Sequence, residues 1–306
     1  MSLSNKYTLI GLLILGSIGL NAQTRYLDSL FSTSKKTTKE YAVVDGESLK
    51  LDIYQAAGDT QTDRPAMIWM HGGGFQGGAR DGDGEVQFME LLAKRGYVAV
   101  SISYRLTAKG KGFSCDASRK EKMETFRKAS WDLWDAIAYI HQNAKELGID
   151  PQKLIIGGSS AGAEGALNAI YMRDWLYEGD HPYDAIQPMA VLSLAGAIID
   201  VRYVNEQNAV PAIFFHGTAD KLVPYATAAH HYCDAKDTGY IWLDGSRTIS
   251  KRLKELNTPY VLYTFEGAGH EIAGIPFDRM QELLTYFYLL MNQTKEMRVE
   301  VNISQK

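Results

Sequence analysis

Short apolar runs alternate with longer amphipathic stretches along most of the chain. The runs consist mainly of aliphatic and aromatic residues, and they cover residues 65–70, 97–103, 154–156, 189–194, 211–215 and 260–265. Uninterrupted apolar runs are typical of strands buried on both faces of a parallel sheet. Two further expected strands, 41–44 and 49–54, flank the turn pair Asp45-Gly46, which predicts a hairpin.

The stretches between the runs have apolar residues at helical spacing. The clearest is 118–146, where Phe126, Leu133 and Ile137 lie on one face of the expected helix. The other helices are expected over residues 85–95, 161–173, around 252–256 and over 278–291. Strands alternating with helices predict an α/β fold, with a mostly parallel eight-stranded sheet and helices on both faces.

The length and charge of the chain limit what it can do. Its 306 residues are enough for one large core, so we expect a single domain. The formal net charge is −4 and there is no notable basic cluster, so binding of nucleic acid or of an anionic membrane surface has no support. The polar segments 24–39 and 293–306 are expected to be exposed.

The N-terminus has the layout of an export signal. Lys6 precedes an apolar run over residues 9–20, which is too short to span a bilayer comfortably. We therefore interpret residues 1–22 as a signal peptide cleaved after Ala22, with an uncleaved anchor as the alternative. The mature domain is then residues 23–306, exported to the periplasm or secreted, with no membrane attachment after cleavage.

The chain has two cysteines, Cys115 and Cys233. In an oxidising compartment such a pair can form a disulfide, whereas two separately buried thiols are the equally weighted alternative. Only His230 and His231 lie near a cysteine at ligand spacing, so no metal site is predicted.

The most informative motif follows the apolar run 154–156. Residues 158–162 read Gly-Ser-Ser-Ala-Gly, which fits the G-x-S-x-G pattern of a nucleophile on a sharp turn between a strand and a helix. This makes Ser160 the candidate nucleophile, and the two glycines leave room for the tight backbone. A Ser/Gly-rich loop after a core strand is the alternative, so further support has to come from other motifs.

Three consecutive glycines, residues 72–74, follow the expected strand 65–70. A glycine-rich loop at the C-terminal end of a central strand is where α/β sheets bind ligands, and its N–H groups can stabilise an oxyanion. His71 is interpreted as a residue that fixes this loop rather than as a catalytic base, because the base in this arrangement lies late in the chain.

An aspartate and a histidine complete the catalytic candidates. Asp220 follows the expected strand 211–215, and His270 follows the expected strand 260–265. The chain order Ser, Asp, His is the one that α/β-hydrolases use, in which histidine takes the serine proton and aspartate orients the imidazole. Asp200 is the competing acid, and Asp220 is preferred because its strand directly precedes the one that carries His270.

Together these motifs resemble the α/β-hydrolase esterases of the hormone-sensitive-lipase-like and acetyl or feruloyl esterase kind. The resemblance covers about residues 41–291 and rests on the segments 71–75, 103–106, 158–162, 216–224 and 267–270. It implies that the N–H groups of Gly73, Gly74 and Ala161 form the oxyanion hole, and that neither a metal nor a cofactor takes part. The segment 107–120 is covered by none of these motifs, so it leaves one wall of the pocket undetermined.

The resemblance implies a serine hydrolase that cleaves carboxylic esters through an acyl-enzyme. Export favours a small ester with a short acyl group or a carbohydrate or feruloyl-type component. The pocket is expected to include Phe75, Tyr104, Trp175 and Tyr203. A serine peptidase of the same fold is one alternative, and a non-catalytic binding protein that kept the fold is another.

Overall fold

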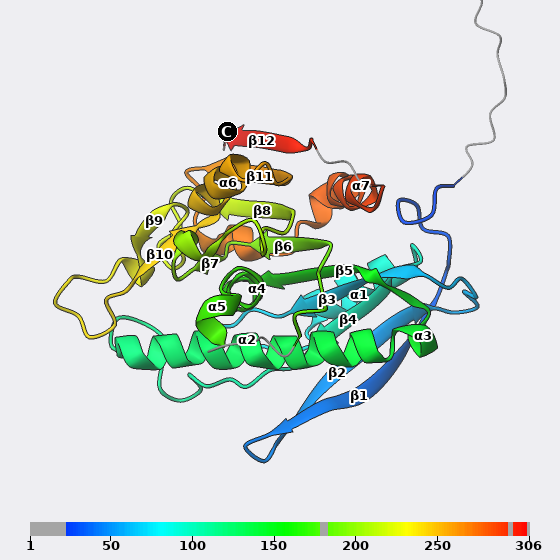
Figure 1. The fold of residues 1–306 in the computed structure, drawn as a ribbon, viewed down its shortest axis with the longest axis horizontal. Coiled ribbons are helices and arrows are strands. Elements are labelled where there is room, and N and C mark those ends of the chain that lie inside the picture. Colours follow the sequence, from blue (N-terminus) through cyan, green and yellow to red (C-terminus); the bar gives the residue numbers. More distant parts are fainter. Residues whose placement is uncertain (1–22, 178–182, 293–295, 305–306) are drawn as a thin grey trace, which may run out of the picture.

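The computed structural model describes residues 23–177, 183–292 and 296–304 (Figure 1). The expected signal peptide, residues 1–22, lies outside the described residues. Within the described ranges, no helix is both long and apolar enough to cross a membrane.

A single large sheet forms the centre of the molecule. Its strands follow the order β1-β2-β4-β3-β5-β6-β8-β11-β12, with β1, β2 and β4 paired antiparallel and the other neighbours parallel. The strands are β1 (Ser34–Val44), β2 (Glu47–Ala56), β3 (Arg64–Met70), β4 (Val98–Ile102), β5 (Ile149–Ser159), β6 (Ala190–Leu194), β8 (Ala212–Gly217), β11 (Tyr260–Glu266) and β12 (Arg298–Ser304). The parallel strands share one C-terminal edge, where α/β sheets bind their ligands.

Helices cover both faces of this sheet, each over its own buried apolar cluster. One face is covered by α1 (Asp83–Ala93) and α7 (Met280–Met291). The other is covered by α2 (Arg119–Gln142), α4 (Ala161–Tyr171) and α6 (Ser246–Glu255), with the short α3 (Ala144–Leu147) and α5 (Arg173–Leu176) beside them. The α/β fold with a mostly parallel sheet and helices on both faces, expected from the sequence, is therefore confirmed.

The strand count of eight was wrong, since the described residues form a nine-stranded sheet. The polar tail 293–306 was expected to be exposed, yet β12 pairs in parallel with β11. Its residues alternate between exposed and half-buried, with Val299 and Val301 on the packed side. A single half-buried edge strand carries too few apolar residues to stand out in a polar tail.

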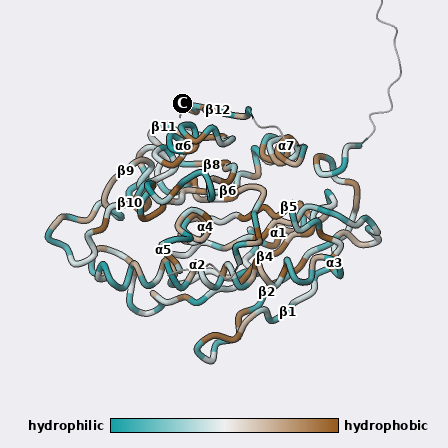
Figure 2. The backbone as a smooth tube through the Cα atoms, viewed as in Figure 1, coloured by the Kyte–Doolittle hydropathy of each residue, from teal (hydrophilic) through white to brown (hydrophobic). Residues whose placement is uncertain are grey.

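The lead-in 24–39 also differs from expectation, because β1 already begins at Ser34 and pairs with β2 across the hairpin. Figure 2 shows hydrophobic residues at the tip of that hairpin, where Val43 is 62% exposed. The tip therefore contributes little to the core.

A second, small sheet was not anticipated. It has the order β7-β10-β9 and consists of β7 (Ala197–Ile198), β10 (Trp242–Gly245) and β9 (Thr227–Ala229). In the described part of the chain, the connections also contain the short 3₁₀ helices η1 (Val201–Tyr203), η2 (His230–Tyr232), η3 (His270–Ala273) and η4 (Phe277–Arg279). Strands of two to four residues carry no recognisable period, which explains why the sequence pattern missed them.

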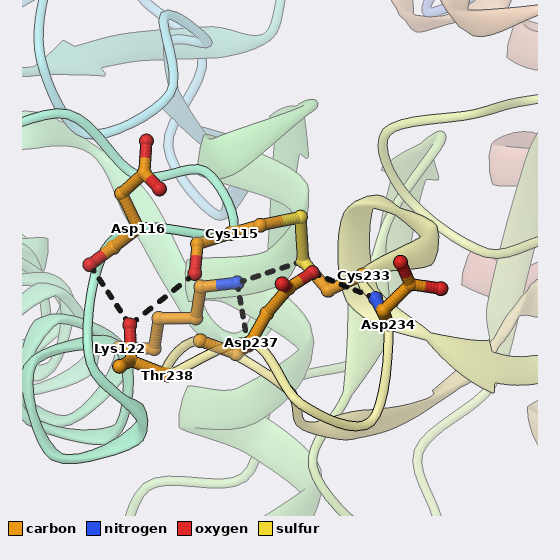
Figure 3. Close-up of a disulfide and its surroundings, with 8 residues drawn as sticks. Cys115, Asp116, Lys122, Cys233, Asp234, Asp237 and Thr238 are labelled. Atoms are coloured by element: carbon orange, nitrogen blue, oxygen red, sulfur yellow. Dashed lines mark hydrogen bonds between the residues drawn. A yellow bond between two sulfur atoms is a disulfide. The ribbon is translucent and has the colours of Figure 1, made fainter.

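A disulfide joins Cys115, in the loop before α2, to Cys233, just after η2 (Figure 3). Two hydrogen bonds also connect the loop before α2 and the start of α2 to the segment after η2. The Gly239 N–H donates to the Cys115 carbonyl at 2.9 Å, and the Lys122 ammonium donates to the Gly239 carbonyl at 2.9 Å. Of the two alternatives for the cysteines, the structure has the disulfide. The bond fixes the loop 107–118 against the segment 230–240.

Candidate active site

The backbone at Ser160 is strained. It has φ 51° and ψ −122°, a left-handed φ that non-glycine residues rarely adopt, at the turn between β5 and α4. The turn is possible because Gly158 and Gly162 have no side chains. A Cβ atom at Gly158 would lie 2.3 Å from the Gly162 carbonyl, and one at Gly162 would lie 2.1 Å from the Met70 carbonyl oxygen. This turn places Ser160 directly after β5, at the C-terminal edge of the sheet.

Gly162→Ala is expected to destabilise the protein by about 3 kcal/mol, because the new methyl group would meet the rigid backbone of β3. The measurement is the free energy of unfolding in urea. Gly165→Ala, on the same helix, is the matched control, since its methyl group would meet mainly the flexible end of the Met70 side chain. An equal decrease of the unfolding free energy in the two variants would contradict this explanation of why Gly162 is required at the turn.

Ser160, His270 and Asp220 meet at the C-terminal edge of the sheet, just after β5, β11 and β8. The Ser160 Oγ lies 2.7 Å from His270 Nε2, and His270 Nδ1 lies 2.7 Å from Asp220 Oδ2. Asp220 accepts a hydrogen bond from the Nδ1–H group, so Nε2 is left unprotonated and accepts a hydrogen bond from the serine hydroxyl. Asp200 makes no such contact, because it caps η1 and binds the Arg202 side chain.

Asp220 is buried and held by several donors. Its Oδ1 accepts hydrogen bonds from the N–H groups of Leu222 at 2.8 Å and Val223 at 3.0 Å. His216, also buried, places Nε2 3.4 Å from Asp220 Oδ2 and is itself held through Ser246. Burial alone would raise the pKa of Asp220, but the hydrogen bonds from His216 and His270 lower it well below the usual aspartate value.

This lowered pKa predicts a stability change in acid. Because the folded pKa of Asp220 is below the unfolded one, its contribution is complete above about pH 4–5 and is lost as the pH falls towards the folded pKa. The difference in unfolding free energy between the wild type and Asp220→Asn should therefore shrink between pH 6 and pH 3. Urea unfolding at each pH measures it. If the difference in unfolding free energy stayed constant with pH, the lowered pKa of Asp220 would be contradicted.

The glycine loop approaches Ser160 from β3. Gly73 and Gly74 have φ values of 120° and 63°, and a Cβ atom at Gly73 would lie 2.3 Å from the Gly77 carbonyl oxygen. Within the described residues, no hydrogen bond uses the N–H groups of Gly73, Gly74 or Ala161. All three residues line the cleft that contains Ser160.

His71 holds this loop in place. Its Nδ1–H donates to the Gly72 carbonyl at 2.7 Å, its ring packs on Tyr104, and the Tyr104 hydroxyl donates to the His71 carbonyl at 2.9 Å. Burial lowers the pKa of His71, which keeps the ring neutral. These contacts agree with the interpretation of His71 as a loop-fixing residue.

An open cleft of about 540 Å³ lies over Ser160 and His270. The four aromatic residues expected in the pocket do not line it, since Phe75 and Tyr104 are core residues and Trp175 packs on Arg127. Tyr203 lies in η1, away from the cleft lining. The aromatic wall is instead Phe113, from the segment that the motifs left undetermined.

Three buried polar residues near the cleft were not recognised as part of a site from the sequence: Glu164, His230 and His216. Glu164 lies four residues after Ser160, one helical turn along α4, and this spacing could have indicated it. His230 and His231 were considered only as metal ligands. His231 lines the cleft, and burial, together with Lys122 and His270, lowers its pKa to about 4.

Comparison with known proteins gives matches among esterases. Residues 51–181 match the BD-FAE family. Carboxylesterase 1F of Mus musculus is 33% identical over 172 residues, covering 54% of this chain and 28% of that protein. Fumonisin B1 esterase of Sphingopyxis macrogoltabida is 34% identical over 104 residues, covering 32% of this chain and 18% of that protein. The chain thus spans between 18% and 28% of the length of these two relatives.

Solved structures of esterase 2 from Thermogutta terrifontis share the architecture. The form phosphorylated by paraoxon has a TM-score of 0.63 and 24% identity, covering 84% of this chain and 94% of that one. The butyrate-bound form has a TM-score of 0.61 and 24% identity, with the same two coverages. The chain has the α/β-hydrolase fold, and its resemblance to esterases of this fold is confirmed.

Proposed function

We propose that this protein is a serine esterase that hydrolyses carboxylic esters. The observation that carries the proposal is the continuous hydrogen-bonded chain from Ser160 through His270 to buried Asp220, with Ser160 open to the cleft. Serine is a weak nucleophile at neutral pH, and a base at 2.7 Å activates it. The matches to esterases support the same reaction.

The proposed reaction has two steps. Ser160 Oγ attacks the ester carbonyl carbon while its proton passes to His270 Nε2, and His270 then gives that proton to the departing alcohol. Water attacks the resulting acyl-enzyme, His270 takes its proton, and the carboxylic acid leaves as Ser160 regains a proton. Asp220 stabilises the imidazolium formed in each step.

The oxyanion of each tetrahedral intermediate requires hydrogen-bond donors. Gly73, Gly74 and Ala161 are the proposed donors, because these residues line the cleft and their N–H groups have no acceptor among the described residues. Ala161 also begins α4, so its N–H lies at the positive end of the helix dipole. The chemistry proposed here requires neither a metal nor a cofactor. The two cysteine sulfurs, bonded to each other, are not free to be metal ligands.

We propose a short acyl group, or a carbohydrate-linked or feruloyl-type ester, as the substrate. The match to the BD-FAE family supports this, and esterase 2 of T. terrifontis has been solved with propionate and with butyrate. We further propose that the protein is exported after cleavage of residues 1–22, which the disulfide supports, since disulfides persist mainly in oxidising compartments. Mass spectrometry of the native protein should find Gln23 as its first residue.

The activity is tested with a substrate panel and a covalent probe. The purified protein should hydrolyse p-nitrophenyl acetate or butyrate, and a fluorophosphonate should label Ser160. Higher kcat/KM for an aminoacyl-p-nitroanilide would favour a serine peptidase. No hydrolysis and no labelling would favour a binding protein that kept the fold.

A further inference from the structure

A buried acid and a buried histidine lie together beneath the cleft. Glu164, in the first turn of α4, is 2% exposed, and His230, in η2, is fully buried. Glu164 Oε1 lies 3.4 Å from His230 Nε2. This contact is not a hydrogen bond. Among the described residues, Glu164 Oε1 and both ring nitrogens of His230 have no hydrogen-bond partner. Buried polar atoms without partners are rare and costly, so three in one place require an explanation.

The surroundings favour the uncharged form of both groups. Burial raises the pKa of Glu164 well above its usual value, an effect to which Asp220 adds and which Lys122 opposes. Burial also lowers the pKa of His230, helped by the nearby His231 and Lys122. A neutral carboxylic acid has one donor and one acceptor, as has a neutral imidazole. The pair can therefore both give and receive hydrogen bonds.

The pair adjoins the bond-cleaving residues. Glu164 lines the same cleft as Ser160 and His270, and its backbone N–H donates to the Ser160 carbonyl at 2.9 Å. Phe113 forms the apolar wall of that cleft and packs edge-on against His230, with ring centroids 5.4 Å apart. A substrate held at Ser160 thus lies in a cleft whose lining includes both an apolar ring, Phe113, and a carboxyl-bearing residue, Glu164.

We propose that Glu164 forms a subsite for a hydroxyl group of the substrate, with His230 positioning its carboxyl group. A hydroxyl in the cleft can form a hydrogen bond with the Glu164 carboxyl group, whereas a methyl group of the same size cannot. The inference rests on the proposed esterase function and narrows it to esters with a hydroxyl near the scissile bond. That hydroxyl can belong to the acyl part, as in a hydroxy acid, or to the alcohol part, as in a sugar.

Binding to the Ser160→Ala variant tests the subsite without turnover. Two pairs of esters differ only by hydroxyl against methyl: methyl 3-hydroxybutyrate with methyl 3-methylbutyrate, and 2-hydroxyethyl butyrate with propyl butyrate. Calorimetric or NMR titration gives the dissociation constants. We expect the hydroxyl member of one pair to bind at least about tenfold more tightly, and the pair that discriminates tells which side of the ester carries the hydroxyl.

Variants then assign the preference to Glu164. In the Ser160→Ala background, adding Glu164→Leu should bring the ratio of dissociation constants close to one, and adding Glu164→Gln should keep most of it, because the amide retains a donor and an acceptor. Glu271→Gln is the matched control, since Glu271 lines the same cleft but already accepts from the Gly269 N–H at 2.8 Å. It should leave the ratio unchanged.

Two results would overturn the subsite. One is that the Ser160→Ala protein binds both members of each ester pair with equal affinity. This measurement does not depend on the folding of any Glu164 variant. The other is a preference that survives Glu164→Leu. Hydrolysis is measured separately with the wild type on the same esters. Discrimination in binding without any hydrolysis would remove the esterase proposal and leave the hydroxyl subsite standing.

Discussion

Ser160→Ala is expected to lower kcat for p-nitrophenyl butyrate by about 10⁴-fold or more. The hydroxyl is the only group in the proposed reaction that forms the acyl-enzyme, and removal of a member of such a set has effects of this size in serine hydrolases. The turn between β5 and α4 should tolerate the change, because alanine removes one oxygen and leaves the backbone contacts of Gly158 and Gly162 untouched. Initial rates and urea unfolding measure the two effects separately.

Ser159→Ala is the matched control for this variant. Its hydroxyl donates to the Ala273 carbonyl at 2.7 Å and makes no hydrogen bond with His270 within the described residues. Loss of that bond should cost about 1 kcal/mol of stability and leave kcat within about tenfold of the wild type. If Ser159→Ala lost as much activity as Ser160→Ala, or if a fluorophosphonate labelled Ser159, the assignment of the nucleophile would be wrong.

Removal of the disulfide is expected to lower the unfolding free energy by about 4–5 kcal/mol. Cys115 and Cys233 are separated by 118 positions, and closing so long a loop removes much of the entropy of the unfolded chain. The variant is Cys115→Ser/Cys233→Ser, compared with the oxidised wild type by urea unfolding. Because the bond also holds the loop that carries Phe113, the KM for an ester should rise more than kcat falls.

Thr238→Val is the control, because it changes the same contact between the loop 107–118 and the segment 230–240. The Thr238 hydroxyl donates to the carbonyls of Asp116 at 3.2 Å and Cys115 at 3.4 Å, so this variant weakens the contact and keeps the disulfide. Thr238→Val should lower the unfolding free energy by about 1 kcal/mol. A reduced wild type that unfolds at the same urea concentration as the oxidised protein would show that the cross-link contributes no stability.

The sequence by itself was sufficient for the fold class and for the positions of the candidate catalytic residues. The inner strands are buried on both faces, so each appears as a mostly apolar run such as 154–156, and the candidate catalytic residues follow three of these runs. The strained turn at Ser160 admits only a few residue types, which makes it readable as a local motif. Because these strands are recognisable in the sequence, Ser160, Asp220 and His270 could each be placed just after the end of a strand.

Only the tertiary structure decided what surrounds those residues. Phe113 and His230 are more than a hundred positions apart and come together because a disulfide joins their loops, and nothing in the local pattern of either loop specifies the other. Glu164 looks like an ordinary polar residue of a helix until packing removes it from water. The cleft is therefore a product of long-range contacts, whose energy depends on burial and geometry that periodicity along one chain does not encode.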